Sequence, residues 1–547
     1  MRNLWTDPTT LAVTCGRGVV PYLKQELINL GYEILGENDT MVGIRANNAC
    51  RDILRLNLSL RTAQRVLWPF VQDVKCRNLD DLYDLAVYAP WEQVLDIDQP
   101  FYVNNATRNV ESVVDSRMPT LKLKDAIVDR MRARCGRRPN VGDTVSVKVE
   151  ADGKALFERP VPLRNAMRIV RAAIEDWLNE IPPEKDRADI LIEIDGYDLM
   201  SGSLYLPKLD LMVLKKRFER TFASRLEGGT PAAAVFLWWE GTHAKIYLDT
   251  SGTVLSRRGY RKEGWVAPMQ EALAAATVMA TGWDRKVPFL VPFSGSGTPA
   301  IEAALMARNI LPGIFRADFA FMHLKGWKNI IPGEKVSTPS VRKRFGATPQ
   351  EIWRDLLAQA RAAEVDADDP RLPKIIGVDW EGKAVDIAAA NAAAAGVAKN
   401  IAFFEDDFTD TPIPQQPGVI FMNPPYGERL EDEDSLMPLY EGIGTWLRGL
   451  PADWKAWVIT SSKPLSLKIR LTTSEILPFK NGPLDCRFIS YDIHGPIPEL
   501  PEEEVSAPVD AVDETASEAD VDADAPTTPV VAASVESAAT AEDALHA

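Results

Sequence analysis

A motif of one carboxamide, two prolines and an aromatic ring can hold a planar group that bears an NH2. It follows the apolar run Val419–Met422, which predicts a buried parallel strand, and open α/β sheets bind ligands at the carboxyl ends of such strands. Asn423 offers an acceptor oxygen, Pro424 and Pro425 fix a backbone without N–H groups, and Tyr426 offers a stacking face. Pro and Gly also end strands in ordinary turns, so the motif alone leaves a turn and a substrate site equally open.

A second motif, much earlier in the chain, has the pattern of strand, glycine turn and helix. Phe289–Val291 predicts a short buried strand, Gly295–Thr298 a tight turn, and Pro299 the start of a helix. Glycines let a ligand approach the backbone without Cβ clashes, and a helix start presents free N–H groups. The spacing also fits the dinucleotide pattern, but that pattern is weak and expects an acidic residue about 20 positions later.

The next elements continue an alternation of strands and helices. Ile375–Val378 predicts a second strand that ends in Asp379, too far along for the dinucleotide pattern but able to bind ribose hydroxyls. A helix around Ala384–Asn391 follows, then a third strand, Ile401–Phe404, leads into Asp406 and Asp407. Strands that alternate with helices favour a parallel α/β sheet, here a Rossmann-like one.

This order of parts resembles the class I S-adenosylmethionine-dependent methyltransferases. The residues of these motifs are most similar to those of the bacterial THUMP-containing RNA methyltransferases, and within them to those of the 23S ribosomal RNA guanine-N2 methyltransferases. The similarity covers about residues 10–140 and 231–495. The matching blocks are Gly259–Arg261, Ala267–Met269, Glu271–Ala274, Pro292–Ala304, Asn423–Leu430 and Asn481–Ile493.

The resemblance implies S-adenosylmethionine as cofactor and assigns roles to the residues of both motifs. Gly295 and Gly297 would line the methionine part of the cofactor, and Pro292, Ser294 and Thr298 belong to the same turn. Asp379 would bind the ribose hydroxyls and Asp407 the adenine amino group. Asn423, Pro424, Pro425 and Tyr426 would hold the target base.

The chain departs from the family pattern in two places. Family members usually have Asp-Pro, a small residue and Cys before the glycine turn, whereas this chain has Val291, Pro292, Phe293 and Ser294. The absence of an acidic group beside the cofactor's ammonium predicts binding weaker by about 1–3 kcal/mol. The second departure is the longer link Gly333–Arg371, in which Trp353 suggests an added helix that contacts either RNA or only the sheet.

Three functions remain open from these motifs. The favoured one is methyl transfer to the exocyclic N2 amino group of a guanosine in ribosomal RNA, by in-line displacement from a sulfonium and without a dedicated general base. The target guanine must leave its stack in the RNA to reach the pocket. The second is an adenine-N6 or protein-glutamine methyltransferase. The motif Asn423–Tyr426, which we call the Asn423 clamp, fits those planar NH2 groups too. The third is a non-catalytic RNA-binding ribosome-assembly factor, which Val291 and Ser294 motivate.

The N-terminal third predicts small α+β modules with basic surfaces. Leu11–Val13 and Met41–Ile44 read as strands around a helix at Tyr22–Leu30, and the segment Leu54–Val66 is expected to form a partly basic face. Leu121–Arg138 predicts a helix with apolar residues every four positions. The resemblance implies that it grips RNA, and phosphate contacts of this kind give salt-sensitive affinity without choosing a base. The candidate contacts are Lys122, Lys124, Arg130, Arg134, Arg137 and Arg138.

The expected organisation is multidomain. It comprises a ferredoxin-like module (1–60), a THUMP module (61–140), an inserted α+β segment (141–230), a THUMP completion and linker (231–260), a class I methyltransferase domain (261–498) and an acidic disordered tail (499–547). The net charge of −16 comes mainly from that tail, because residues 1–498 hold 64 acidic and 62 basic residues. A nearly neutral folded part is compatible with ribosomal RNA or a pre-ribosomal particle as partner.

Cysteine spacing and hydropathy point to a cytoplasmic protein. The five cysteines are scattered without a C-x-x-C pair, so neither a zinc site nor a disulfide framework is expected. No long apolar run predicts a signal peptide or a membrane span. The sequence does not determine an oligomeric state.

Overall fold

The computed structural model describes residues 5, 7–115, 117–139, 232–262, 268–327, 347–426 and 433–496, together with the backbone of four strands between residues 144 and 205. Three expectations lie outside these residues: the tail from residue 499, the helix expected over residues 165–179, and the end of the Asn-Pro-Pro-Tyr-Gly motif from Gly427 on.

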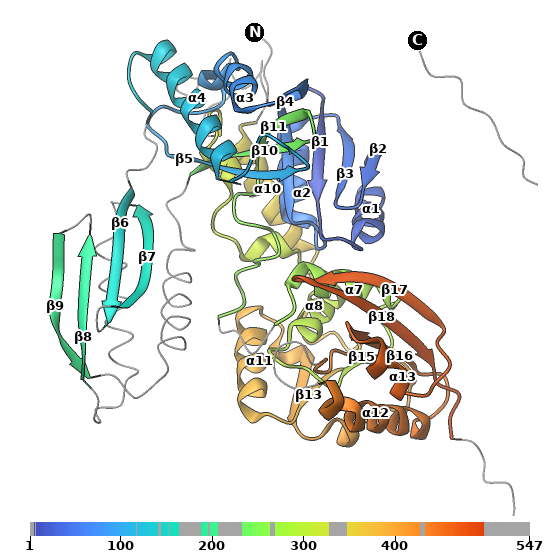
Figure 1. The fold of residues 1–547 in the computed structure, drawn as a ribbon. Helices are drawn as coiled ribbons and strands as arrows, with labels where there is room; N and C mark the ends of the chain where they lie inside the picture. The colour runs from blue at the N-terminus through green and yellow to red at the C-terminus, as the bar shows by residue number, and fades with distance from the viewer. Residues whose placement is uncertain are drawn as a thin grey trace, which may run out of the picture. The chain divides into compact units, whose positions relative to one another are not determined.

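A seven-stranded mixed sheet forms the N-terminal part, in the order β2-β3-β1-β4-β11-β10-β5 (Figure 1). Its strands are β1 (Thr9–Thr14), β2 (Glu33–Asn38), β3 (Met41–Ala46), β4 (Arg65–Lys75), β5 (Phe101–Arg108), β10 (Ala233–Glu240) and β11 (His243–Asp249). Its helices are α1 (Val20–Asn29), α2 (Ala49–Ser59), α3 (Leu79–Val87) and α4 (Met118–Cys135). Only the β5–β10 pair is parallel among these strands. The α+β character expected from the sequence is confirmed.

A separate antiparallel sheet lies within the segment between α4 and β10. Its order is β7-β6-β8-β9, with β6 (Thr144–Ala151), β7 (Lys154–Pro162), β8 (Arg187–Ile194) and β9 (Tyr197–Tyr205). The two strands expected at residues 145–150 and 190–194 are confirmed as β6 and β8. Each pairs with a following strand, β7 or β9, that the sequence pattern did not indicate.

The C-terminal sheet has the order β14-β13-β12-β15-β16-β18-β17. The bounds are β12 (Phe289–Val291), β13 (Ile375–Asp379), β14 (Ile401–Glu405), β15 (Val419–Met422), β16 (Lys455–Thr460), β17 (Glu475–Asn481) and β18 (Leu484–Asp492). The first five strands are parallel, while β18 runs antiparallel to β16 and β17. The order reverses between β12 and β15, so the strand ends that precede the two motifs are adjacent.

Helices cover both faces of this sheet. They are α7 (Glu271–Ala280), α8 (Thr298–Ala307), α11 (Gly382–Ala394), α12 (Met437–Gly449) and α13 (Lys463–Lys468). Val291 and Phe421 join the apolar cluster that contains α7 and α8, whereas Leu290 and Ile420 join the cluster that contains α12. Alternate residues of these strands thus enter different apolar clusters, so both faces of each strand are buried. This explains why the strands are apolar throughout, as is typical of buried parallel strands.

The added helix expected near Trp353 is confirmed as α10 (Pro349–Ala362), which begins with a capping box at Thr348 and Glu351. It packs against α2 of the N-terminal part. Trp353 also makes edge contacts with Phe319 and Phe321, with ring centroids 5.3 Å apart in each pair. The described contacts of α10 therefore join it to the N-terminal part and not only to the sheet.

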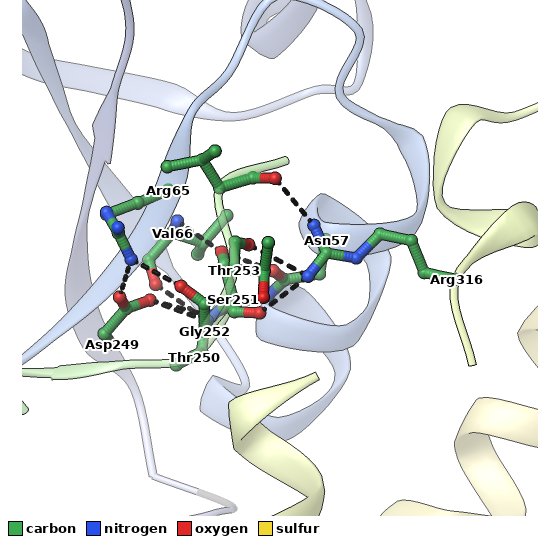
Figure 2. Close-up of polar contacts among 10 residues, drawn as sticks. Asn57, Arg65, Val66, Asp249, Thr250, Ser251, Gly252, Thr253 and Arg316 are labelled. Atoms are coloured by element: carbon green, nitrogen blue, oxygen red, sulfur yellow. Dashed lines mark hydrogen bonds and ion pairs between the residues drawn. The ribbon is translucent and has the colours of Figure 1, made fainter. Parts of the chain in front are cut away.

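A buried turn after β11 joins the two large sheets, and Figure 2 shows the side chains that converge on it. Asn57 of α2 donates to Thr250 Oγ1 at 2.9 Å and accepts from Ser251 Oγ at 2.6 Å. Arg65 pairs with the buried carboxylate of Asp249. From the C-terminal side, Arg316 donates to the carbonyls of Ser251 and Thr253 at 3.0 and 2.9 Å, and to that of Val254 at 3.0 Å.

The basic face expected over Leu54–Val66 is wrong. Helix α2 ends at Ser59, so this segment is half helix and half connection to β4. Arg61 is partly buried and donates to the carbonyl of Ile310 at 2.8 Å, and desolvation lowers the pKa of Arg61 to about 10. Arg65 pairs with Asp249. These cations join parts of the fold, because their carbonyl and carboxylate partners lie in the interior.

Candidate active site

The glycine turn after β12 leaves one side open and packs closely on the other. Gly295 and Gly297 both have positive φ, +51° and +80°. A Cβ on Gly297 would lie 2.9 Å from the Cβ of Ala388, whereas a Cβ on Gly295 would meet no atom within 4 Å. Gly297 therefore allows close packing of the turn on α11, while Gly295 exposes backbone where a ligand can approach.

Asp379, at the end of β13, lies against this turn. Its Oδ2 accepts a hydrogen bond from Gly295 N at 2.8 Å, and its Oδ1 accepts one from Glu381 N at 3.2 Å. Burial raises the pKa of Asp379, and the two backbone hydrogen bonds oppose that rise. The structure thus brings together the turn and the acidic strand end that the sequence singled out separately.

The Asn423 clamp begins where β15 ends, next to β12. Asn423 Oδ1 is buried and has no hydrogen-bond partner among the described residues. The carbonyl of Pro425 accepts from Tyr440 Oη at 3.2 Å, and the Oη of Tyr426 accepts from Asn481 Nδ2 at 2.8 Å. The clamp therefore has a fixed backbone and a fixed ring, beside an acceptor that can take a further donor.

The segment before the C-terminal sheet supports the glycine turn through hydrogen bonds. Arg261 Nη2 donates to Thr298 Oγ1 at 2.9 Å. Lys262 N donates to Asn391 Oδ1 at 2.9 Å, and Asn391 Nδ2 donates to the carbonyl of Ser296 at 3.2 Å. In the sequence, Gly259–Arg261 is only a matching block, whereas the structure makes Arg261 a direct support of the first turn of α8.

Below this support lies a buried ion pair. The Nε of Arg258 lies 3.4 Å from Oε1 of Glu302 on α8, and both side chains are almost fully buried. Tyr260 Oη donates to the same oxygen at 3.0 Å. Arg258 also donates to the carbonyl of Arg61, which ties the helix after the glycine turn to the N-terminal part.

The strand end that departs from the family pattern is apolar. Val291 is fully buried in β12, and the Oγ of Ser294 is buried with no partner among the described residues. Phe293 stacks on Phe408 with ring centroids 5.1 Å apart. Pro292 lies between these residues and is buried as well. No carboxylate therefore occupies the position that is acidic in the similar family.

Two further residues lie near the site, Asp407 from the sequence-based prediction and Trp380, which the prediction did not include. Asp407 is exposed, and its Oδ1 accepts from Thr409 N at 2.9 Å and from Thr409 Oγ1 at 2.7 Å, as the cap of a short 3-10 helix. Its role toward an adenine amino group stays a prediction. Trp380, which follows Asp379, is 75% exposed and was not singled out. An aromatic residue directly after an acidic strand end was the available signal, because such a ring can cover a flat ligand.

The proposed RNA contacts on α4 divide into paired and exposed cations. Lys122 lies 2.9 Å from Asp80, Arg130 lies 2.7 Å from Glu92, and Arg137 lies 2.5 Å from Asp98. Arg134 and Arg138 are exposed, and Lys124 is half-buried. The apolar face expected for this helix is confirmed, since the residues it buries include Leu123, Ile127 and Met131.

Within the residues that the structure describes, no group of three His, Cys, Asp or Glu side chains could hold a metal ion. The helices of that same part are all too short or too polar to cross a membrane.

Comparison with known protein families agrees with these parts. Residues 10–67 match the RlmL ferredoxin-like domain, and residues 76–150 match the THUMP domain. Residues 258–489 match the RMKL-like methyltransferase domain. The chain carries a ferredoxin-like, a THUMP and a methyltransferase domain. The ferredoxin-like, THUMP and Rossmann-like methyltransferase architecture expected from the sequence is confirmed.

The curated proteins to which this chain is similar include two that are named for RNA. The ribosomal RNA large subunit methyltransferase K/L of Syntrophotalea carbinolica is 28% identical over 494 residues, which cover 89% of this chain and 54% of the relative. The chain thus spans about half the length of that relative. A Synechocystis protein named "Putative RNA methyltransferase slr0064" is 27% identical over 481 residues, which cover 88% of this chain and 96% of that protein.

A solved structure shares the fold of this chain. It is described as a predicted N6-adenine-specific DNA methylase from Listeria monocytogenes. It is 24% identical, covers 90% of this chain and 97% of its own, and has a TM-score of 0.61. Because the substrate in its description differs from those of the relatives, the shared fold does not select a substrate.

Proposed function

We propose that this chain transfers a methyl group from S-adenosylmethionine to the exocyclic N2 amino group of a guanosine in RNA, with large-subunit ribosomal RNA, alone or in a pre-ribosomal particle, as the substrate. The observation that carries the proposal is the buried Oδ1 of Asn423, which lacks a partner among the described residues. A buried acceptor without a partner is costly, so a bound donor would stabilise it. An exocyclic NH2 is such a donor.

The turn after β12 and the end of β13 fit the cofactor. Gly295 offers open backbone, Asp379 offers a half-buried carboxylate, and Trp380 offers an exposed ring beside it. S-adenosylmethionine, when bound, supplies an electrophilic methyl group on a sulfonium. Pro292, Ser294, Gly297 and Thr298 would shape the wall around it, and Asp407 would reach the adenine end.

At the clamp, the chain's own residues would orient the nucleophile. Asn423 Oδ1 and the carbonyl of Pro424 would accept from the NH2, which favours the pyramidal nitrogen that attacks. The ring of Tyr426 would stack on the base, held by Asn481. Methyl transfer needs alignment more than covalent help, so the fixed positions of these groups are the catalytic contribution. The base must be unstacked to enter.

The THUMP part and α4 would supply affinity for the RNA. Arg134 and Arg138 are exposed, and their contacts with phosphates would add affinity without base selection. A chain that modifies ribosomal RNA would act in the cytoplasm. In this proposal the N-terminal part binds the RNA, and the clamp selects the nitrogen atom that is methylated.

The test compares modified nucleosides in ribosomal RNA from a parent strain and from a strain that lacks the gene. We expect N2-methylguanosine to fall by one site per ribosome in the deletion strain. Wild-type protein should restore that site, and Asn423→Ala protein should not. An unchanged N2-methylguanosine level would contradict the proposal, and a fall in N6-methyladenosine instead would favour the adenine alternative.

A second function has its own supporting observation. Val291 and Ser294 occupy positions where the similar family has Asp and Cys, and the Ser294 hydroxyl has no partner among the described residues. Cofactor affinity would then be weakened so far that the chain only binds RNA, as an assembly factor. Calorimetry with S-adenosylmethionine separates the two functions. Absence of measurable binding by a folded sample would favour the assembly factor.

A further inference from the structure

The ring of Tyr426 is held from a distant part of the chain. Its Oη accepts a hydrogen bond at 2.8 Å from Asn481, which is the last residue of β17. Asn481 pairs with Leu484 across the tight turn of the β17–β18 hairpin. Tyr426 itself follows β15, and β16 and β18 lie between β15 and β17 in the sheet order. The hairpin turn therefore reaches back across the sheet to the clamp.

The same hairpin lies against the loop between β1 and α1 of the N-terminal sheet. Gly18 has a φ of +84°, and a Cβ there would lie 2.2 Å from the carbonyl oxygen of Pro478 and 3.0 Å from Cα of Phe479. Lys480 N donates to the carbonyl of Arg17 at 3.3 Å. Only a glycine permits such an approach of two backbones at this φ.

An aromatic pair strengthens this contact. The ring of Tyr22 on α1 stacks on Phe479, with centroids 5.7 Å apart and planes 19° apart. Phe479 is buried and packs edge-on against Phe488 of β18, with centroids 6.1 Å apart. The hairpin is therefore anchored at three consecutive residues, 478–480, and the next residue is Asn481.

We propose that Asn481 is a positioning residue for the stacking ring of Tyr426, and that the β17–β18 hairpin couples the ring to the β1–α1 loop of the N-terminal part. This inference rests on the proposed function, because it takes Tyr426 as the ring that stacks on the target base. The path runs from Gly18 through residues 478–480 to Asn481 and then to the Tyr426 hydroxyl. A part of the chain assigned to RNA binding thereby also orients the clamp.

Kinetics of methyl transfer to ribosomal RNA give the first test. Asn481→Ala should lower kcat about tenfold, because a ring that rotates away misaligns the base, and should leave the KM for RNA and the Kd for S-adenosylmethionine within about twofold. Tyr426→Phe should cause a similar reduction, and the double variant should be no slower than either single variant. Asp485→Ala, on the same hairpin but exposed, is the matched control and should behave as wild type.

A second measurement does not depend on activity. With 3-fluorotyrosine at residue 426, the ¹⁹F resonance should shift in Asn481→Ala and in Gly18→Ala but not in Asp485→Ala. An unshifted resonance in Asn481→Ala, or additive effects on kcat in the double variant, would overturn the inference. If the resonance shifts as expected but wild-type protein transfers no methyl group, the proposed function fails while the coupling of hairpin and ring remains.

Discussion

Asn423 and Tyr426 are held to different degrees, and this decides what each can do to a bound base. The Oδ1 of Asn423 is buried without a partner among the described residues, whereas the hydroxyl of Tyr426 already accepts from Asn481. A free acceptor can recognise an NH2, and a fixed ring can only support the base from its face. We therefore expect removal of the Asn423 side chain to affect the chemical step and not the cofactor.

Asn423→Ala should lower kcat by about 100-fold or more, as removal of one group that stabilises a transition state does, and leave S-adenosylmethionine affinity near normal. Single-turnover transfer and calorimetry measure the two effects. Asn400→Ala is the matched control, because its Oδ1 is also buried without a described partner but lies just before the edge strand β14, whereas Asn423 follows the central strand β15. Abolished cofactor binding in Asn423→Ala would contradict this division of roles.

Val291 stands where the similar family has an acidic residue, and a substitution there tests what this difference does to cofactor binding. Val291→Asp should tighten S-adenosylmethionine binding about tenfold, because a charged hydrogen bond to the ammonium contributes about 1.5–3 kcal/mol. It should also lower the Tm of the unliganded protein, since the position is fully buried. Val291→Asn has a similar size without charge. Calorimetry that finds equal affinities for the two variants would refute the expectation.

At the scale of elements, α4 carries cations that pair with acidic side chains and exposed cations that we propose as RNA contacts. Arg130 donates to both carboxylate oxygens of Glu92 at 2.7 and 3.0 Å, and hydrogen bonding to Arg130 lowers the pKa of Glu92. Arg134 and Arg138 are exposed. Among the six candidates from the sequence, Arg134 and Arg138 are therefore the arginines to test first as phosphate contacts.

The double variant Arg134→Ala/Arg138→Ala should weaken RNA binding for all sequences alike, and should reduce the salt slope of log K by about 1 for each phosphate that the variant no longer neutralises. Filter binding across salt concentrations measures the slope. Arg130→Ala should instead lower stability and leave the slope unchanged. An unaltered slope in the double variant would show that α4 does not bind phosphates.

The elements that carry the site could be predicted, because their signals are local. Phe289–Val291, Ile375–Val378, Ile401–Phe404 and Val419–Met422 are short apolar runs between turn residues, and all four are strands. Strands β7 and β9 and the break of α2 at Ser59 were missed. Their pattern depends on partners distant in sequence, and local periodicity does not contain that information.

The site residues divide in the same way. Asp379 and Asn423 end apolar runs, so their positions follow from the strands. The supports Asn481, Arg261 and Tyr440 bond to partners between 15 and 55 residues away, and no local pattern specifies such contacts. Trp380 was within reach of sequence reasoning, because its exposure beside Asp379 follows from its place after the strand.

At the scale of the whole molecule, the described N-terminal and C-terminal sheets meet at the turn of residues 249–254. Arg316 donates to three carbonyls of that turn, and burial lowers its pKa to about 10. Asp249 and Arg65 hold the turn from the other side. The described contact between the two sheets at this turn therefore rests on polar groups.

Arg316→Ala should lower the free energy of unfolding by about 2 kcal/mol, because it removes the donor from the part-buried carbonyls of Ser251 and Val254. Chemical denaturation followed by tryptophan fluorescence measures the change. Arg371→Ala is the control, since that side chain is 87% exposed and pairs with Asp369 at the surface. Equal free energies of unfolding for the two variants would contradict the stabilising role of Arg316 at the turn of residues 249–254.

The central claim is methyl transfer to guanosine N2, and one reconstituted reaction tests it most directly. The purified chain is incubated with methyl-labelled S-adenosylmethionine and large-subunit ribosomal RNA from a strain that lacks the gene, and the RNA is digested to nucleosides. We predict that the label appears in N2-methylguanosine with wild-type protein and is absent with Asn423→Ala. Label in another nucleoside, or no label from a folded protein that binds S-adenosylmethionine, would contradict the claim.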